Sequence, residues 1–378
     1  MDDINQSALK LHRKFSGKIE IKSKVPLKSR RDLALAYTPG VAAVSRAVYK
    51  NPGAARDYTI KRNAVAVVTD GSAVLGLGNL GPLAALPVME GKCALFKEFG
   101  GVDAWPICLA TQDTEEIIAA VKNIAPSFGG INLEDIGAPR CFEIEERLRR
   151  ELDIPVLHDD QHGTAVVVLA ALINALKLKR LAKQKARVVI NGAGAAGTAI
   201  ARILADYGFK NIVVCDKRGA IHKGRRDLSR HKRLLSALTN RESRRGDLGN
   251  ALRGADIFIG VSAGNILNAE MVRAMNPRPV IFALANPTPE IDPRLAEETG
   301  AFIVATGRSD FPNQINNVLA FPGIFRGALD RGVRRITQKM LIRAARSLAA
   351  CTRNLSAAQI LPSPFDRKVP RAVASAIR

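Results

Sequence analysis

Short apolar runs alternate with amphipathic stretches along most of this chain, and turn residues separate them. The run Ala64–Thr69 predicts a buried strand, and residues 87–99 and 114–123 follow with the spacing of apolar positions that is typical of helices. Residues 130–135 predict a strand that runs into a loop, and residues 154–157 predict another short strand. Strands that alternate with helices predict an α/β first domain over residues 1–157.

The pattern continues into a second α/β domain, which we place at residues 158–378. An apolar helix is expected first, at residues 165–178. Short apolar runs follow, as in the strands of a parallel sheet that is covered on both faces, at residues 186–191, 211–215, 255–260, 280–286 and 303–306. The sequence therefore predicts a Rossmann-like, doubly wound sheet. The tail after residue 361 contains prolines, and we expect it to wrap loosely over the domain and to end in a short helix.

A glycine-rich turn lies between the first strand and helix of the second domain. Gly192-Ala193-Gly194-Ala195-Ala196-Gly197 has a strand before it and a helix after it, and an acidic residue follows 19 positions later. Gly192 permits the tight turn, Gly194 lets a pyrophosphate approach the backbone, and Gly197 allows close packing of helix and strand. We predict that Gly192, Gly194, Ala195, Ala196 and Gly197 bind a dinucleotide at the helix N-terminus.

Asp216 is the acidic residue that ends the next strand. Its carboxylate would accept hydrogen bonds from the adenosine ribose, which favours NAD. Lys217 and Arg218 follow immediately and could hold a 2′-phosphate, which favours NADP. The sequence leaves both cofactors open, with a lean toward NADP.

Two acidic pairs point to a metal. Asp159-Asp160 stands where a predicted strand gives way to a helix, and Glu134-Asp135 lies about 25 residues upstream. Adjacent ionised carboxylates repel each other, which is tolerable only beside solvent or a cation. Three of these side chains could bind a hard divalent ion and leave the fourth for proton chemistry. A solvated helix start, capped by aspartate, would explain the second pair equally well.

Four further side chains could carry chemistry. Tyr37 precedes a Pro-Gly turn and could donate a proton, although it could also cap a core. Lys92 lies in an apolar helical stretch, where desolvation would lower its pKa toward neutrality and make it a base, unless it reaches solvent. Asn286 and Asn317 adjoin apolar runs and could bind a substrate carboxylate or the nicotinamide amide, or could stabilise their own turns.

Composition limits the class of protein. With 378 residues, 47% of them hydrophobic, the chain can form two cores. No apolar run reaches the roughly 18 residues of a membrane span, and the acidic start Met1-Asp2-Asp3 lacks the apolar stretch of a secretory signal. Five scattered cysteines predict reduced thiols and a cytoplasmic protein.

The net charge of +22 is concentrated in two segments. Residues 217–245 hold eleven Lys or Arg against two acids, and residues 331–378 hold eleven against one. Such segments attract polyanions, so nucleic-acid binding has to be considered. Aromatic residues make up only 5% and do not interleave with the basic runs, so we favour solvated basic faces and expect no nucleic-acid partner.

These pieces occur in the order of a known family. The chain resembles the bacterial-type malic enzymes of the short form over nearly its whole length. The matching motifs are Tyr37-Thr38-Pro39-Gly40-Val41-Ala42, Thr69-Asp70-Gly71-Ser72, Gly76-Leu77-Gly78-Asn79, Gly91-Lys92, Glu134-Asp135, His158 to Thr164, Gly192 to Gly197, Ala285-Asn286-Pro287, Asn313-Gln314-Ile315-Asn316-Asn317 and Phe321-Pro322-Gly323.

The resemblance implies oxidative decarboxylation of L-malate to pyruvate with NAD or NADP and Mg²⁺ or Mn²⁺. It implies that Glu134, Asp135 and Asp160 bind the metal and that Asp159 lies beside the base. Lys92 would take the C2 hydroxyl proton, and Tyr37 would protonate C3 after carbon dioxide leaves. It also implies a homodimer or a larger homo-oligomer.

One departure and two alternatives remain at this stage. Larger animal-type members carry an arginine for malate after the Thr-Asp-Gly triplet, where this chain has Ser72-Ala73-Val74, so the substrate carboxylate needs another partner. A dehydrogenase for another C4 hydroxy acid would share most of these features. A basic nucleic-acid-binding protein with a vestigial Rossmann fold would share the charge and the glycine-rich turn.

Overall fold

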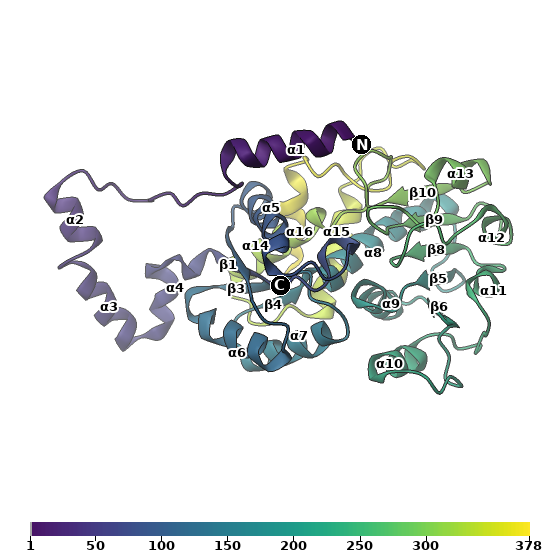
Figure 1. The fold of residues 1–378 in the computed structure, drawn as a ribbon, viewed down its shortest axis with the longest axis horizontal. Helices are drawn as coiled ribbons and strands as arrows, with labels where there is room; N and C mark the ends of the chain where they lie inside the picture. Colours follow the sequence, from purple (N-terminus) through teal and green to yellow (C-terminus); the bar gives the residue numbers. More distant parts are fainter. Residues whose placement is uncertain (1) are drawn as a thin grey trace.

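Two parallel sheets lie side by side, with helices between and around them (Figure 1). The computed structural model describes residues 2–378, with side chains from residue 4 onward. Met1, part of the acidic start considered above, lies outside the described residues. The predicted boundary at residues 157 and 158 falls at the end of the first sheet, and the independence of the two parts stays a prediction.

The first sheet has the order β2-β1-β3-β4, and its neighbouring strands pair in parallel. Its strands are β1 (Ala64–Thr69), β2 (Asp103–Cys108), β3 (Gly130–Leu133) and β4 (Val156–His158). Helix α5 (Pro82–Gly100) covers one face. On the other face, α6 (Thr114–Ile124) and α7 (Arg140–Glu151) enclose a separate apolar core.

The second sheet has the order β10-β9-β8-β5-β6-β7. Its strands are β5 (Arg187–Asn191), β6 (Asn211–Asp216), β7 (Gly219–Ala220), β8 (Ile257–Gly260), β9 (Val280–Ala283) and β10 (Ile303–Thr306). All pairs are parallel except β6 with β7. The order reverses between β5 and β8, and ligands of such sheets bind at the carboxyl ends of the strands beside that point.

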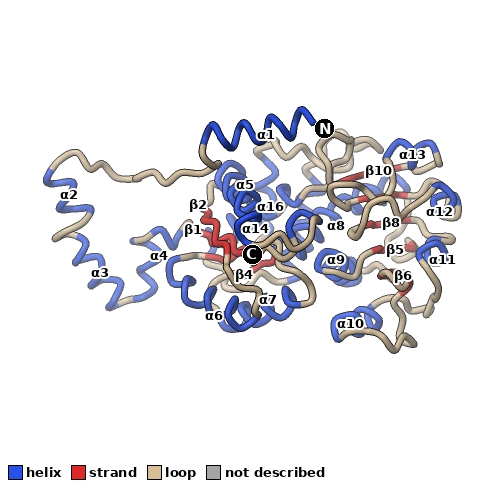
Figure 2. The backbone as a smooth tube through the Cα atoms, in the orientation of Figure 1, coloured by secondary structure: helices blue, strands red, loops and turns tan. Residues whose placement is uncertain are grey.

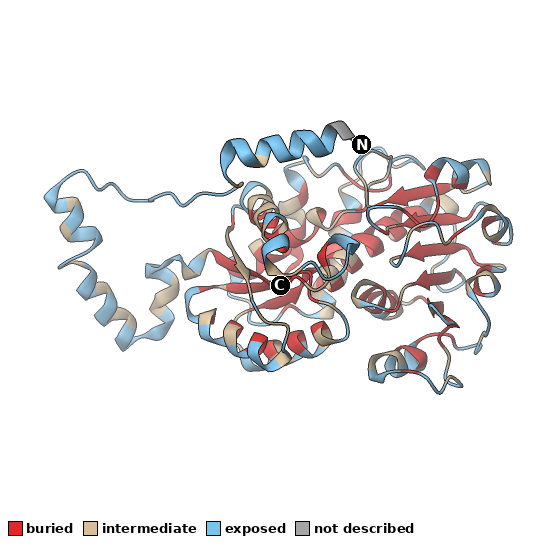
Figure 3. Ribbon diagram, viewed as in Figure 1, coloured by how far each residue is buried: buried red, intermediate tan, exposed pale blue. Residues whose placement is uncertain are grey.

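Helices pack against the second sheet and border it. One face packs on α8 (Asp159–Lys179), α9 (Ala195–Tyr207) and α15 (Gln338–Ala350), whose buried residues belong to a core that continues into the first sheet. Shorter helices border the sheet elsewhere: α10 (Arg230–Leu238), α11 (Leu248–Leu252), α12 (Ala269–Arg273) and α13 (Pro293–Glu298). Figure 3 shows this buried centre spanning both sheets.

Helix α8 is long and apolar enough to cross a membrane by length and composition alone. However, 72% of its most apolar window is buried inside the protein. It packs against α9 and α15, which identifies it as a core helix.

The tail after residue 361 ends in a short helix, as predicted, but it packs tightly rather than wrapping loosely. Helix α16 (Lys368–Ala376) buries Val369 and Val373 and packs against α14 (Phe321–Arg331) and α15. Phe321 and Phe325 of α14 contact Phe96 of α5, with ring centroids 4.7 and 5.3 Å apart. The tail therefore closes the core of the first sheet, because its apolar positions recur with helical spacing.

Strand β2 was not predicted. Asp103 and Pro106 weaken its strand pattern, and proline removes a hydrogen-bond donor. The strand is tolerated because it lies at the edge of the sheet, where one side of its backbone needs no strand partner.

The N-terminal segment extends away from both sheets. Helix α1 (Asp2–Phe15) lies along the outside of the first sheet's helices, and α2 (Arg30–Ala36), α3 (Val41–Lys50) and α4 (Ala55–Tyr58) form an arm that projects from the body (Figures 1 and 2). None of the residues in α2, α3 or α4 is buried. We refer to residues 19–62 as the N-terminal arm.

Candidate active site

Four carboxylates and one lysine meet at the carboxyl ends of β3 and β4. Glu134 and Asp135 follow β3, while Asp159 and Asp160 open α8 directly after β4. The two strands are neighbours in a parallel sheet, so their ends lie together. The predicted association of the two acidic pairs is confirmed by the fold.

Three of these carboxylates form a compact cluster. Oxygens of Glu134, Asp135 and Asp160 lie within 4.8 Å of one another, and the backbone N–H of Asp135 donates to Asp160 Oδ2 at 2.8 Å. Asp135 Oδ2 is buried without a hydrogen-bond partner. Burial and the charges of the neighbouring carboxylates raise the pKa of Asp135 to about 9. The cluster thus lacks positive charge on one side, which a hard divalent cation would supply.

Lys92 supplies the positive charge on the other side. It projects from α5, and its Nζ lies 2.6 Å from Asp159 Oδ2 and 2.9 Å from Glu134 Oε1. The side chain is 7% exposed, and its Nζ stands 4.2 Å from the centroid of the Phe321 ring. The predicted burial of Lys92 is confirmed, but the predicted direction of its pKa is wrong. Burial alone would lower the pKa of Lys92, and the charges of Asp159 and Glu134 outweigh burial and raise it.

Asp159 is fixed from two further directions. Asn317 Nδ2 donates to Asp159 Oδ2 at 2.5 Å, from a short helical turn that leads into α14. The Asp159 carboxylate also folds back over Gly163, where an added Cβ would lie 1.8 Å from Asp159 Oδ1. Gly163 is therefore required by packing, and Asp159 can adopt one orientation toward Lys92.

The glycine-rich turn has the geometry expected for a dinucleotide. Gly192 has a φ of +121°, and an added Cβ would lie 2.6 Å from the Val261 carbonyl oxygen. A Cβ on Gly197 would lie 1.8 Å from the Gly192 carbonyl oxygen, whereas one on Gly194 would meet nothing within 4 Å. Helix α9 begins at Ala195 and directs its first N–H groups toward this open side.

A cleft of about 670 Å³ connects the acidic cluster to the glycine-rich turn. Lys92, Glu134, Asp135 and Asp160 line it from the first sheet. The second sheet contributes Ala196, Val261, Ser262, Leu284, Ala285, Asn286 and Gly307. The predicted proton, metal and nucleotide groups thus share one space.

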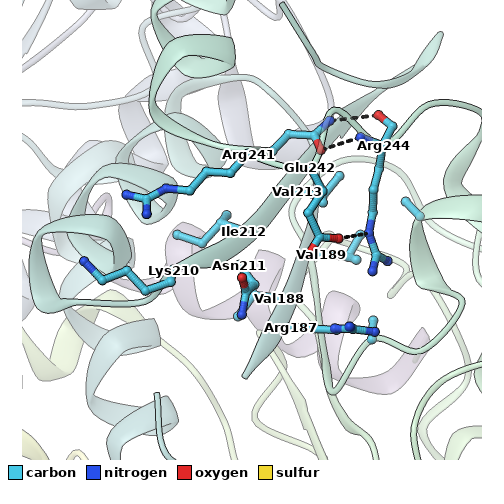
Figure 4. A pocket seen from close by; sticks show the side chains of 13 residues that line it. Arg187, Val188, Val189, Lys210, Asn211, Ile212, Val213, Arg241, Glu242 and Arg244 are labelled. Atoms are coloured by element: carbon cyan, nitrogen blue, oxygen red, sulfur yellow. Dashed lines mark hydrogen bonds and ion pairs between the residues drawn. The ribbon is translucent and has the colours of Figure 1, made fainter. Parts of the chain in front are cut away.

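A second hollow is not a comparable site. It measures about 20 Å³ and is lined by residues at the start of β5 and β6, where Arg244 pairs with Glu242 (Figure 4). Arg187 and Asn211 begin these strands, so the hollow lies at their amino ends. Ligands of open α/β sheets bind at the opposite ends.

Comparison with known proteins agrees with this geometry. Residues 16–149 match the model of the malic enzyme N-terminal domain, and residues 161–377 match the model of the malic enzyme NAD-binding domain. The chain belongs to the malic enzyme family. It has both characteristic domains of that family, in the expected order.

Individual members of the family resemble the chain over its whole length. The bifunctional malic/malolactic enzyme of Bacillus subtilis is 53% identical, over 99% of this chain and 92% of its own length. The NAD-dependent malic enzyme of Geobacillus stearothermophilus is 56% identical, over 96% of this chain and 76% of its own length. The crystal structure of the NAD-dependent malic enzyme of Thermotoga maritima has a TM-score of 0.95 at 53% identity and covers 98% of both chains. These relatives give no support to the nucleic-acid alternative or to another C4 hydroxy acid.

The family resemblance implies that Tyr37 acts in the active site, but Tyr37 does not lie in the cleft of its own chain, and its catalytic role stays a prediction. Tyr37 follows α2 on the N-terminal arm, is 67% exposed and does not line the cleft. Figure 1 shows α2 well away from β3 and β4. None of the residues in α2 or α3 is buried, so these two helices form no packed core with the rest of their own chain.

The two asparagines line the cleft as predicted. Asn286 lies at the end of β9 and faces Gly307, and Asn317 holds Asp159. Whether either amide contacts the cofactor stays a prediction. In the structure, Asn317 orients the Asp159 carboxylate. The residues next to Asn317 in the sequence did not indicate this role.

Several residues of the site were not predicted. Glu145 of α7 is buried and accepts hydrogen bonds from the His158 N–H at 3.1 Å, from Gln161 Nε2 at 3.0 Å and from His162 Nε2 at 3.0 Å. Burial alone would raise the pKa of Glu145, but the charge of His162 contributes most to lowering it to about 2. Glu145 thereby fixes the turn that presents Asp159 and Asp160. It stands among many charged residues of α7, so nothing in the local sequence pattern distinguishes it.

Lys18 also lines the cleft, from the segment that follows α1. Its Nζ donates to the Pro87 carbonyl at 2.6 Å, and burial lowers its pKa. Lys18 and Lys92 are the two lysines that line the cleft.

Proposed function

We propose that the cleft oxidises L-malate at C2 and releases C4 as carbon dioxide, using the groups described above. As a malic enzyme, the chain converts malate and NAD(P)⁺ into pyruvate, carbon dioxide and NAD(P)H. The observation that supports this site most directly is that Lys92, which pairs with Asp159 at 2.6 Å, lines the same cleft as the acidic cluster and Ala196 of the glycine-rich turn.

Glu134, Asp135 and Asp160 would hold Mg²⁺ or Mn²⁺. Their oxygens are hard ligands, they converge within 4.8 Å, and the buried Asp135 Oδ2 has no partner. A divalent ion bound there would stabilise the negative charge that develops on the C2 oxygen. These residues therefore fit the metal that the family resemblance implies.

Lys92 would pass one of its protons to Asp159 and take up the C2 hydroxyl proton in its place, while the nicotinamide would accept hydride from C2. Asp159, 2.6 Å away, holds the ammonium and can share its proton. Asn317 and Gly163 keep Asp159 in place. Lys18 and Asn286 would face the carboxylates of the substrate, because they offer hydrogen-bond donors in the same cleft.

Tyr37 would protonate C3 in the active site of a second copy of the chain. The hydroxyl is needed beside Lys92, yet the arm carries it away from its own cleft. An isologous dimer would bring Tyr37 to an active site, because each arm would reach the partner's cleft and each cleft would receive one arm.

The apolar surface of the arm supports a dimer. Its exposed large apolar side chains include Ile21, Val25, Leu27, Leu33 and Leu35. Monomers rarely expose so many large apolar side chains within one short segment. Helices of seven and ten residues are also too short to be stable without packing partners. A second copy is the occupant we propose for this surface.

The compartment remains a proposal as well. All five cysteines are free in the described structure, and Cys93, Cys141 and Cys215 are buried. Unpaired thiols are typical of a reducing compartment, so we propose that the enzyme works in the cytoplasm.

Initial-rate measurements test the proposed reaction. We expect NAD(P)H absorbance and pyruvate to appear together when malate, cofactor and Mn²⁺ are supplied, and to stop when a chelator is added. Tartrate and other C4 hydroxy acids serve as controls and should turn over far more slowly. Turnover that is unaffected by the chelator would contradict the metal site, and absence of pyruvate would contradict the reaction.

A further inference from the structure

A buried carboxylate joins the two loops that follow β8 and β9. Glu290 is fully buried, and its Oε1 accepts a hydrogen bond from the Ser262 N–H at 3.1 Å. Its Oε2 accepts a hydrogen bond from the Ala285 N–H at 3.0 Å. Burial raises the pKa of Glu290, and hydrogen bonds from the N–H groups of Ala285 and Ser262 act in the opposite direction. Each oxygen of one carboxylate thus holds the backbone of a different loop.

The side chain of Glu290 lies where the two strands begin to separate. Strands β8 and β9 end with Gly260 paired to Ala283, and the Leu284 N–H donates to the Gly260 carbonyl at 3.0 Å. An added Cβ on Gly260 would lie 2.2 Å from Glu290 Cδ, so the carboxyl group occupies the space next to this glycine. The position and size of the Glu290 side chain therefore set the distance between the two loops.

The backbone groups that Glu290 holds belong to the wall of the cleft. Ser262 and Ala285 both line it, as does Asn286. Ser262 is also tied to the glycine-rich turn, because its Oγ accepts a hydrogen bond from Asn191 Nδ2 at 2.8 Å and Asn191 directly precedes that turn. A displacement of Glu290 would therefore move cleft-lining atoms that follow three neighbouring strands, β5, β8 and β9.

The loops after β8 and β9 lie on one side of the point where the strand order reverses. A dinucleotide bound across such a point places its pyrophosphate at the glycine-rich turn and its adenosine beside the end of the next strand. That strand is β6, which ends at Asp216. The ends of β8 and β9 are then left for the nicotinamide half of the cofactor, and these are the ends that Glu290 joins.

A second buried carboxylate, at the opposite ends of the same strands, offers a comparison. Asp256 directly precedes β8 and is 7% exposed. Its Oδ2 accepts a hydrogen bond from the Arg187 N–H at 2.9 Å, and its Oδ1 accepts one from Asn276 Nδ2 at 3.0 Å. These three residues lie outside the set that lines the cleft. Asp256 thus joins segments of the same sheet by similar bonds, away from the cofactor.

We propose that Glu290 is a positioning residue for the nicotinamide half of the cofactor. Its carboxylate keeps the loops after β8 and β9 at the separation that the nicotinamide ring needs. A carboxylate suits this role because both of its oxygens accept, whereas a glutamine amide would turn its own donors toward one of the two N–H groups. The proposal rests on the proposed function only in taking this cleft as the cofactor site.

Binding of whole and partial cofactors tests this role without turnover. The full-length protein is titrated with NADH and NADPH by nicotinamide fluorescence, and with 5′-AMP and 2′,5′-ADP in a calorimeter. We expect Glu290→Gln to weaken binding of the preferred reduced cofactor about tenfold or more, because small displacements within a site have large effects. The adenosine fragments should stay within about threefold of their wild-type affinity. Gly260→Ala places a methyl group against the same carboxylate and should give the same pattern.

Asp256→Asn is the matched control. It replaces one acceptor of a buried carboxylate in the same sheet by a donor, so we expect a lower thermal midpoint. Its affinities for the reduced cofactor and for the adenosine fragments should both stay within about threefold of wild type. A loss of stability alone would therefore leave cofactor binding unchanged, which separates a structural role from a positioning role.

Three results would overturn the proposal. The first is a folded Glu290→Gln protein that binds the reduced cofactor within about threefold of wild type. The second is equal weakening of the reduced cofactor and the adenosine fragments, or the same selective loss in Asp256→Asn. The third is failure of both Glu290→Gln and Gly260→Ala to fold, which would make Glu290 a residue of stability. A wild type that binds the cofactor but makes no pyruvate would refute the proposed reaction and leave this test intact.

Discussion

Lys92 is the residue whose replacement separates chemistry from folding most clearly. Lys92→Gln keeps a hydrogen-bonding side chain of similar reach but removes the group that carries the C2 proton between malate and Asp159. We expect kcat with malate to fall by about 10²- to 10⁴-fold, the usual contribution of a positioned acid or base. Steady-state rates measure this, and the KM for the cofactor should change little. Lys97→Gln, on the same helix at an exposed side chain, is the control and should retain the wild-type kcat.

The acidic cluster makes a second prediction at the same scale. Without metal, Asp135 faces two other carboxylates, so Asp135→Asn should relieve repulsion and raise the thermal midpoint of the metal-free protein. Mn²⁺ at about a hundred times its Kd should stabilise the wild type by about 2.7 kcal/mol, and should stabilise the variant much less. Thermal unfolding with chelator or with Mn²⁺ measures both shifts. Equal Mn²⁺ stabilisation of the two proteins would rule out Asp135 as a ligand.

Single residues of the site could be found in the sequence, but their partners could not. Lys92 stood out as a cation among apolar residues of a predicted helix, and burial was the only effect on its pKa that those neighbours indicated. The opposite shift arises from Asp159, 67 residues away, and Asn317 reaches Asp159 across 158 residues. Contacts of this range depend on how α5 and α14 pack, which the local pattern does not specify.

At the scale of elements, the first turn of α8 depends on Gly163. A methyl group there would lie 1.8 Å from Asp159 Oδ1, so Gly163→Ala must rotate the carboxylate or shift the helix. We expect kcat to fall about tenfold or more, because the base loses its positioned partner. Gly249→Ala in α11 is the matched substitution, since the nearest atom would be 3.5 Å from the new Cβ, and it should leave kcat and stability near wild type. Initial rates and thermal unfolding of both variants decide the point, and an active Gly163→Ala enzyme would contradict the proposed role of Asp159.

The periodic elements were the predictable part of the fold. Central strands such as β1 and β5 have uninterrupted apolar runs because both of their faces are buried. Edge strand β2 lacks that pattern and was not predicted. The short helix at the end of the tail was predicted, but its packing against α14 and α15 was not, because the prolines before it suggested a loose segment. The arm was the least predictable, since its apolar positions have no partner within one chain.

At the scale of the whole molecule, the groups that we propose for one reaction lie in three places, which are the two sheets and the arm. The first sheet supplies the acids and Lys92, the second sheet supplies the cofactor turn, and the arm carries Tyr37 outward. The first two parts meet through a continuous core that includes α8 and α14. The third part has no buried residue in α2 or α3, and we propose that a second chain places Tyr37 beside Lys92.

Complementation between two inactive chains tests this arrangement. Tyr37→Phe and Lys92→Gln chains are co-expressed with different affinity tags, and the mixed dimer is isolated by sequential purification. If Tyr37 acts on the partner's cleft, one site of the mixed dimer combines an intact Lys92 with an intact Tyr37, so we expect about half of the wild-type rate per dimer. Each parent homodimer should be nearly inactive. A mixed dimer as inactive as its parents, with an unchanged sedimentation coefficient and thermal midpoint, would place Tyr37 in its own chain's site or outside the reaction. Recovery of activity would require the arm to exchange between subunits, because no site in the mixture is intact within a single chain.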